Sequence, residues 1–119
     1  YRVSMDRIFN KIPFRDTVTH DGRFMIPMVD NGNIYFEVVN THDQAVTVEL
    51  VAGLTGGYVG ATRIGLPETV GANSSEGFTV SADDTWGPWV GVQLSFAVAP
   101  TSGFVSVMMA RRELQVSQS

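Results

Sequence analysis

Two tryptophans in one short loop, Trp86 and Trp89, are the most conspicuous candidates for a binding site. They follow the acidic pair Asp83 and Asp84, and flat indole faces beside carboxylates are suited to stacking on sugar rings. Aromatic side chains are equally enriched where proteins contact one another. The loop therefore predicts a contact with another protein, and a carbohydrate-binding platform is the alternative.

The acidic and histidine residues offer little to a metal ion. Calcium takes about six to eight oxygen ligands, and no spaced Asp-x-Asp-x-Asp run is present to join Asp30 and Asn33 to the acidic pair. The two histidines, His20 and His42, each precede an aspartate at an expected turn, without further ligands at a spacing typical of zinc sites. We expect both histidines to be exposed turn residues and the chain to bind no metal.

Residue patterns of catalysis are also missing. The chain has no cysteine and no Gly-x-Ser-x-Gly elbow, and its Gly-rich stretch 53–60 lacks the Gly-Lys-Ser/Thr ending of a phosphate loop. Glu37 and Glu49 lie on neighbouring expected strands, where they could pair as the carboxylates of a glycosidase do. Each alternates with apolar positions, which is simply the pattern of a solvent-facing sheet surface. We expect a non-enzymatic protein without catalytic residues or a cofactor.

Composition narrows the choice of partners. The chain has 119 residues with a net charge of −4, a sign that disfavours nucleic acid and anionic membrane surfaces. No stretch of about 18 consecutive apolar residues occurs, so we expect no membrane insertion. Hydrophobic residues make up 44% of the chain, which is sufficient for the core of one folded domain.

Apolar and polar residues alternate through most of the sequence, as they do in half-buried β-strands. The alternation is clearest across 90–98, and Asp21-Gly22 and Asn31-Gly32 are typical two-residue hairpin turns. About eight strands are expected, at 15–20, 23–29, 33–40, 45–52, 58–65, 76–82, 89–99 and 103–113. This pattern predicts an all-β fold, a single antiparallel β-sandwich of jelly-roll or immunoglobulin-like topology.

Two segments carry more apolar residues than a lone sandwich needs. Residues 1–14 lack clean alternation and are expected to form an extended N-terminal arm beside a sandwich domain of residues 15–119. The last strand, around 104–110, is apolar on both faces, so either the arm or another chain is expected to cover it. The residues expected at a subunit contact are Ile8, Phe9, Ile12, Phe14, Trp86, Trp89, Met108 and Met109.

Four segments between residues 76 and 112 resemble small β-sandwich modules of tailed-phage virion proteins: Glu76-Gly77-Phe78-Thr79-Val80, Trp89-Val90-Gly91-Val92-Gln93-Leu94, Ala99-Pro100-Thr101-Ser102-Gly103-Phe104-Val105-Ser106-Val107 and Ala110-Arg111-Arg112. The resemblance implies a capsid decoration protein or another structural protein at the virion surface. Its expected partners are other copies of the chain, as a homo-oligomer, and a capsid or surface-lattice protein. The strand pattern with its turn at 38–41 is also similar to archaeal and bacterial cell-surface sandwich domains. That second resemblance implies an extracellular module, associated with an S-layer or filament, as the alternative.

Overall fold

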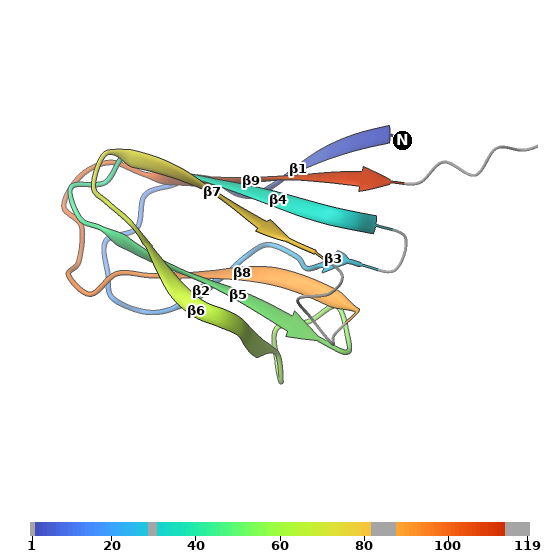
Figure 1. The fold of residues 1–119 in the computed structure, drawn as a ribbon. Helices are drawn as coiled ribbons and strands as arrows, with labels where there is room; N and C mark the ends of the chain where they lie inside the picture. Colours follow the sequence, from blue (N-terminus) through green and yellow to red (C-terminus); the bar gives the residue numbers. More distant parts are fainter. Residues whose placement is uncertain (1, 29–30, 82–87, 114–119) are drawn as a thin grey trace, which may run out of the picture.

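The chain folds into two antiparallel β-sheets packed face to face (Figure 1). The computed structural model describes residues 2–28, 31–81 and 88–113, and in this part it contains strands and no helix that could cross a membrane. These described residues form nine strands: β1 (Arg2–Ile12), β2 (His20–Asp21), β3 (Ile26–Pro27), β4 (Asn31–Asn40), β5 (Val46–Gly53), β6 (Thr62–Val70), β7 (Ser74–Val80), β8 (Trp89–Ser95) and β9 (Val105–Glu113).

The strand order is that of a jelly roll. Sheet A has the order β1-β9-β4-β7, and sheet B has the order β2-β8-β5-β6, with β3 also paired to β8. The paired strands are nested, as if one long hairpin had been folded over itself. From the outermost pair inward they are β1 with β9, β2 and β3 with β8, β4 with β7, and β5 with β6. The all-β antiparallel sandwich is therefore confirmed, and jelly-roll topology is the observed one of the two expected.

Both predicted two-residue hairpins are wrong. The strands on either side of Asp21-Gly22, β2 and β3, lie one after the other along the same partner β8. The strands nearest Asn31-Gly32, β3 and β4, belong to different sheets. A turn signal reports local backbone preference, whereas the hydrogen-bond partners here are distant in sequence. Among consecutive strands of the described chain, only β5 and β6 pair with each other.

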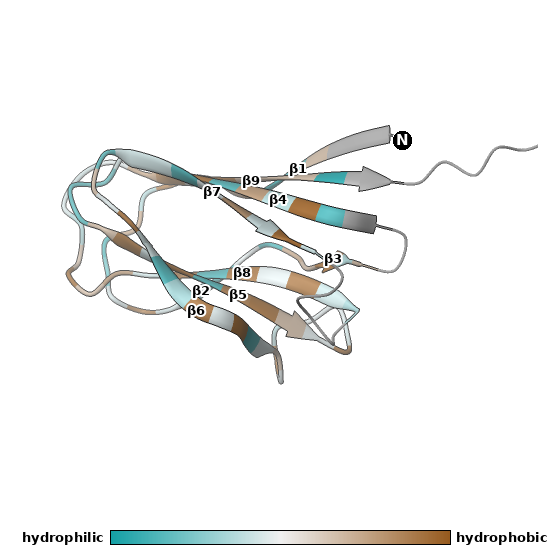
Figure 2. Cartoon of the chain, in the orientation of Figure 1, coloured by the Kyte–Doolittle hydropathy of each residue, from teal (hydrophilic) through white to brown (hydrophobic). Residues whose placement is uncertain are grey.

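Alternate residues of β4, β5, β8 and β9 fill the space between the sheets. Figure 2 shows the resulting apolar bands along β4, β5 and β8. A fully buried aliphatic or aromatic side chain stabilises the fold by about 1.5–3 kcal/mol. The largest fully buried apolar side chains include Phe36, Ile8, Ile26, Ile34, Leu94 and Met109.

The N-terminal segment is a strand of the sandwich. Arg2–Ile12 pairs antiparallel with β9 and forms one edge of sheet A. Irregularities between Arg7 and Phe9, and between Phe9 and Ile12, interrupt the pairing and break the period-2 pattern of the sequence. This interruption explains why the segment was expected to be an arm, separate from the domain of residues 15–119. In the structure it completes that domain.

Candidate interaction surface

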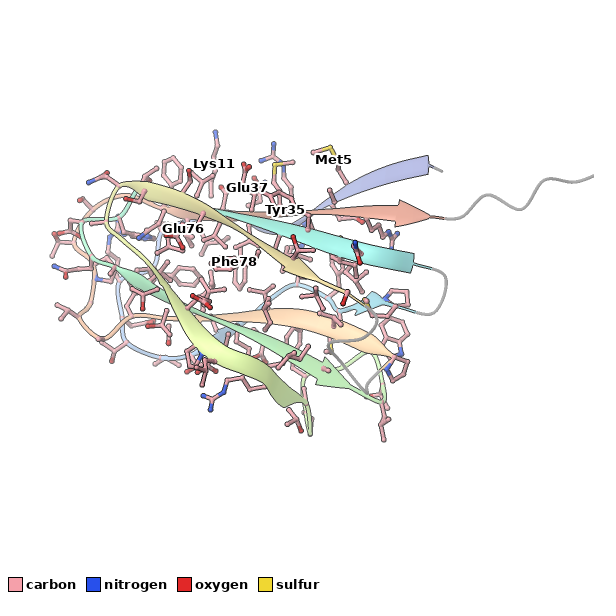
Figure 3. The ribbon with its side chains drawn as sticks, in the orientation of Figure 1. Met5, Lys11, Tyr35, Glu37, Glu76 and Phe78 are labelled. Atoms are coloured by element: carbon pink, nitrogen blue, oxygen red, sulfur yellow. The ribbon has the colours of Figure 1, made fainter. Side chains whose placement is uncertain are left out.

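The outer face of sheet A carries an apolar strip that no other segment of the described chain covers. The strand register places Met5, Ala110 and Tyr35 side by side on β1, β9 and β4. Met5 is 62% exposed and Tyr35 is 43% exposed, and Met5 points away from sheet B (Figure 3). The expectation that β9 is apolar on both faces holds here, because Met109 fills the core below while Ala110 lies on the outer face.

The adjacent row of the same face has a charge at each end. Arg7 on β1 pairs with Met108 on β9, which pairs with Glu37 on β4. Two strand spacings separate Arg7 from Glu37, about 10 Å between backbones. The Arg7 guanidinium donates a hydrogen bond to the Asn10 side-chain oxygen at 2.9 Å. Among the described residues, neither Arg7 nor Glu37 has an ion-pair partner.

The Tyr35 ring is held in place by a glycine on the next strand. Gly77 on the edge strand β7 is adjacent to Tyr35, and a β-carbon at position 77 would overlap the phenol. The ring therefore covers bare backbone of the edge strand, a way of compensating for a glycine in a sheet. The apolar strip consequently continues from β1 almost to the far edge of sheet A.

Lys11 adds a second positive charge beside the apolar strip. Its backbone N–H donates to the Ser106 hydroxyl at 3.1 Å, which ties β1 to β9 where the regular pairing is interrupted. The Lys11 ammonium lies 5.9 Å from the centre of the Phe104 ring, within cation–π range. In Figure 3 the Lys11 side chain points to the same side as Met5. The β1 side of the outer face is therefore basic.

Seven of the eight residues expected at a subunit contact lie in the described part of the chain, and they fall into two groups. Four of them are buried in this chain's own core, namely Ile8, Phe9, Phe14 and Met109. The irregular pairing of β1 turns both Ile8 and Phe9 inward, and Met109 alternates with the outward Met108. Ile12 is 37% exposed, and Met108 and Trp89 are partly exposed. Trp86 lies outside the described residues.

Trp89 contacts its own chain at the end of sheet B. A β-carbon on Gly56, in the loop between β5 and β6, would lie 3.5 Å from the Trp89 ring. The indole therefore packs against that loop. Asp83 and Asp84, the other parts of the expected sugar platform, lie outside the described residues.

Tyr58 has a structural role that sequence reasoning missed. Its hydroxyl donates to the Phe24 carbonyl at 3.1 Å and accepts the Val92 backbone N–H at 3.2 Å. These bonds lie where the partner of β8 changes from β2 to β3, so the hydroxyl replaces a missing strand-to-strand hydrogen bond. Burial raises the pKa of Tyr58. A lone tyrosine in a Gly-rich stretch is the signal available in the sequence.

His42 is buried, so its expected exposure was wrong. The ring packs against Phe96, at 4.8 Å between ring centres, and beside Phe14, at 6.2 Å, and its Nδ1 lies 3.0 Å from the Asn40 side-chain oxygen. Burial lowers the pKa of His42, and the positive charge of Arg15 lowers it further. His20 is partly exposed and its Nε2 lies 2.8 Å from Asp16.

The acidic residues do not assemble into a catalytic or metal site in the part of the chain that the structure describes. Glu37 is on sheet A, whereas Glu49 is on sheet B and lies 3.6 Å from Arg63. These two carboxylates therefore belong to different layers. No group of three or more His, Cys, Asp or Glu side chains among the described residues is arranged to hold a metal ion.

Comparison by sequence gives no relatives: no protein-family model and no curated protein matches the chain. Comparison by structure gives many. A protein from Bacillus endospore appendages, described as disulfide-linked pili, has a TM-score of 0.56 at 17% identity, over 95% of this chain and 89% of that chain. The SPBc2 prophage-derived protein YomS has a TM-score of 0.55 at 10% identity, over 92% of both chains.

The VP2 subviral particle of infectious bursal disease virus gives a TM-score of 0.54 at 13% identity, over 92% of this chain and 32% of that chain. This chain therefore corresponds to about one third of the viral protein. At such identities the similarity extends to the fold alone. The chain shares a two-sheet β-sandwich with proteins from a pilus, a prophage and a virus particle.

Proposed function

We propose that this chain is a non-enzymatic structural subunit at the surface of a virus particle, such as a capsid decoration protein. It binds neighbouring protein subunits through the outer face of sheet A. The observation that carries the proposal is the apolar strip of Met5, Ala110 and Tyr35, which continues into Met108 and is open to solvent.

Successive residues of a strand point to opposite faces of its sheet. The outward residues of a two-layer sandwich normally face water and are polar. Methionine at these positions is costly to hydrate, and its flexible thioether adapts to the shape of a partner. Burial of apolar surface releases about 25 cal/mol per Å², so a protein covering this strip gains affinity directly.

The free edge of sheet A offers a second route of attachment. Among the described strands, the long strand β1 pairs with β9 on one side only. The Ile8 carbonyl accepts the Arg23 backbone N–H at 3.2 Å, and the remaining backbone groups along this side of β1 are the ones offered to a further strand. Such edges accept strands from partner proteins. Ile12, at the end of β1 and 37% exposed, adds apolar surface to this edge. A capsid or surface-lattice protein is the expected partner there.

The fold comparisons support two kinds of particle. The prophage protein and the viral capsid structure favour a virion component, in agreement with the tailed-phage resemblance of residues 76–112. The endospore appendage, together with the adhesin domain of Lys-gingipain from Porphyromonas gingivalis at a TM-score of 0.56 and 14% identity, favours a cell-surface or filament subunit. The virion remains our first choice, and the extracellular surface is the alternative.

The test is to locate the native protein. Virus particles and cell-surface fractions are purified from the source, and the chain is quantified in each by mass spectrometry with a labelled standard. A fixed ratio to the main capsid protein, maintained through density-gradient purification, is the expected result. Recovery in the surface or filament fraction supports the alternative. Absence from both assembled fractions overturns the proposal.

A further inference from the structure

We infer that the outer face of sheet A binds the same face of a second copy, forming a dimer whose two-fold axis runs along β9. The inference rests on the proposed function in one respect, because it takes this face to be a protein contact. It goes further by naming the partner and the orientation. The order of charged and apolar residues across the sheet determines this orientation.

The row through Met108 is complementary to itself. It reads basic, apolar and acidic across β1, β9 and β4, as Arg7, Met108 and Glu37. A two-fold axis along β9, midway between two facing sheets, exchanges the strands on its two sides. Arg7 then faces the partner's Glu37, Glu37 faces the partner's Arg7, and Met108 meets the partner's Met108. Both ion pairs form at once.

The neighbouring row fits the same axis. Met5 faces the partner's Tyr35, Tyr35 faces the partner's Met5, and Ala110 meets the partner's Ala110. Methionine sulfur against an aromatic ring is a favourable contact. The small Ala110 at the centre lets the two sheets approach closely. Because the Tyr35 ring already lies against Gly77, it is ordered before the partner arrives and loses little freedom on binding.

Charge selects this axis over the other two-fold arrangement of facing sheets. An axis across the strands, through the same row, would place Arg7 on the partner's Arg7 and Glu37 on the partner's Glu37. Facing sheets pack about 10 Å apart with their strands inclined by about 30°. At one strand spacing from the axis this inclination shifts a residue by about 2.5 Å. Arginine and glutamate side chains span such a shift.

The first test exchanges the charges and measures mass in solution by sedimentation. Wild type is expected to dimerise, and 0.5 M salt is expected to weaken the dimer. Arg7→Glu alone, or Glu37→Arg alone, creates two like-charged contacts and is expected to raise the dimer Kd by at least about tenfold. An equimolar mixture of the two single variants restores both ion pairs, so heterodimers are expected to form.

The mixture controls for misfolding, because it contains the same two variants that are expected to dimerise poorly when each is alone. Glu76→Arg is the matched control: it makes the same charge change on β7 of sheet A, at an exposed position opposite the core residue Val38 rather than on the outer face. It should leave the dimer unchanged. Single variants that remain dimeric, or a mixture that remains monomeric, would overturn the two-fold arrangement.

The second test uses the absence of cysteine from the sequence. Met108→Cys places one thiol on the proposed axis, and with the facing sheets about 10 Å apart the two thiols lie beyond disulfide range but within reach of a short bifunctional maleimide, which should yield a cross-linked dimer. Thr79→Cys is the control, since position 79 lies on the same outer face but on β7, two strands from the axis. Equal cross-linking of the two variants at low protein concentration contradicts the proposed axis.

The outcomes separate this inference from the proposed function. A chain that is found in purified particles but is monomeric in solution at all concentrations retains the function and loses the dimer. A charge-dependent dimer that is absent from particles and surface fractions retains the dimer and loses the function.

Discussion

The ring of Tyr35 on β4 lies against the backbone of Gly77 on β7, in the space where a side chain at position 77 would be. The Tyr35 ring leaves no room for a side chain at position 77, and the glycine there gives the ring room to lie on the strand. Glycine weakens an edge strand because it brings no packing surface, and the phenol supplies that surface from the neighbouring strand. The same contact fixes the position of the aromatic ring on the outer face of sheet A.

Gly77→Ala is therefore expected to have opposite effects in two backgrounds. In wild type the new methyl group displaces the Tyr35 ring and destabilises the fold by about 1–3 kcal/mol. In a Tyr35→Ala background the space is free, and alanine stabilises the strand by about 0.5–1 kcal/mol through reduced backbone entropy of the unfolded chain. Urea denaturation of the four proteins gives the coupling free energy. Equal effects in both backgrounds would show that the ring does not occupy this space.

Tyr58→Phe tests the hydroxyl that joins the interrupted edge of sheet B. Removing the oxygen leaves the Val92 N–H and the Phe24 carbonyl without the bonds they make in wild type. We expect a loss of about 1–3 kcal/mol in the free energy of unfolding, because both hydrogen bonds of the hydroxyl are partly buried. Tyr35→Phe removes a hydroxyl from the exposed outer face of sheet A and is the matched control. The prediction fails when the two variants are equally stable.

Asn40 is the buried side chain that joins three segments at one end of the sandwich. Its amide donates to the carbonyls of Gln44, at 2.9 Å, and Gly71, at 3.1 Å, and its oxygen accepts the His42 N–H at 3.1 Å. Asn40→Ala is expected to lower the free energy of unfolding by about 2–4 kcal/mol, since several buried partners lose their bonds together. Thermal melts check this, with Ser75→Ala on the exposed edge strand as control. Comparable melting temperatures for both variants would contradict the prediction.

The long alternating strands could be predicted from the sequence because their cause is local. Val90, Val92 and Leu94 alternate with residues that face away from the core, and a strand was expected there at 89–99. It ends at Ser95, although Phe96 beyond it is still buried. The buried residues therefore continue beyond the last strand-to-strand hydrogen bond. The apolar pattern of the sequence reports burial and does not show where the hydrogen bonding ends.

The features of the fold that could not be predicted from the sequence depend on contacts between segments that are distant along the chain. Interrupted pairing concealed β1, because it places Ile8 and Phe9 together in the core where alternation would separate them. The expected strand at 58–65 begins only at Thr62, since Tyr58 is used to bridge β8 and Phe24. Met108 was among the residues expected at a contact. The row of Arg7, Met108 and Glu37 could not be predicted from the sequence, because it depends on the register between β1, β9 and β4.

The buried His42 makes stability depend on pH, with a definite sign. Its pKa in the folded state lies below the ordinary value of 6.5 because burial and Arg15 disfavour the charged ring, against the opposing effects of the Asp43 carboxylate and the Phe14 backbone. Below pH 6.5 the His42 ring therefore binds a proton in the unfolded chain more readily than in the folded chain. The contribution of His42 is complete above pH 6.5 and is lost as the pH falls toward the folded pKa.

Urea denaturation at pH 7.5 and pH 5.5 measures this loss. One proton limits it to about 1.4 kcal/mol per pH unit. His42→Leu is expected to flatten the dependence on pH in this interval, whatever its effect on stability at pH 7.5. His20→Gln, at the partly exposed histidine, is expected to retain the part of the slope that His42 contributes. The lowered pKa of Asp16 and Asp43 affects stability only near and below about pH 4, so these carboxylates do not obscure the result. An unchanged slope in His42→Leu would assign the pH dependence to other groups.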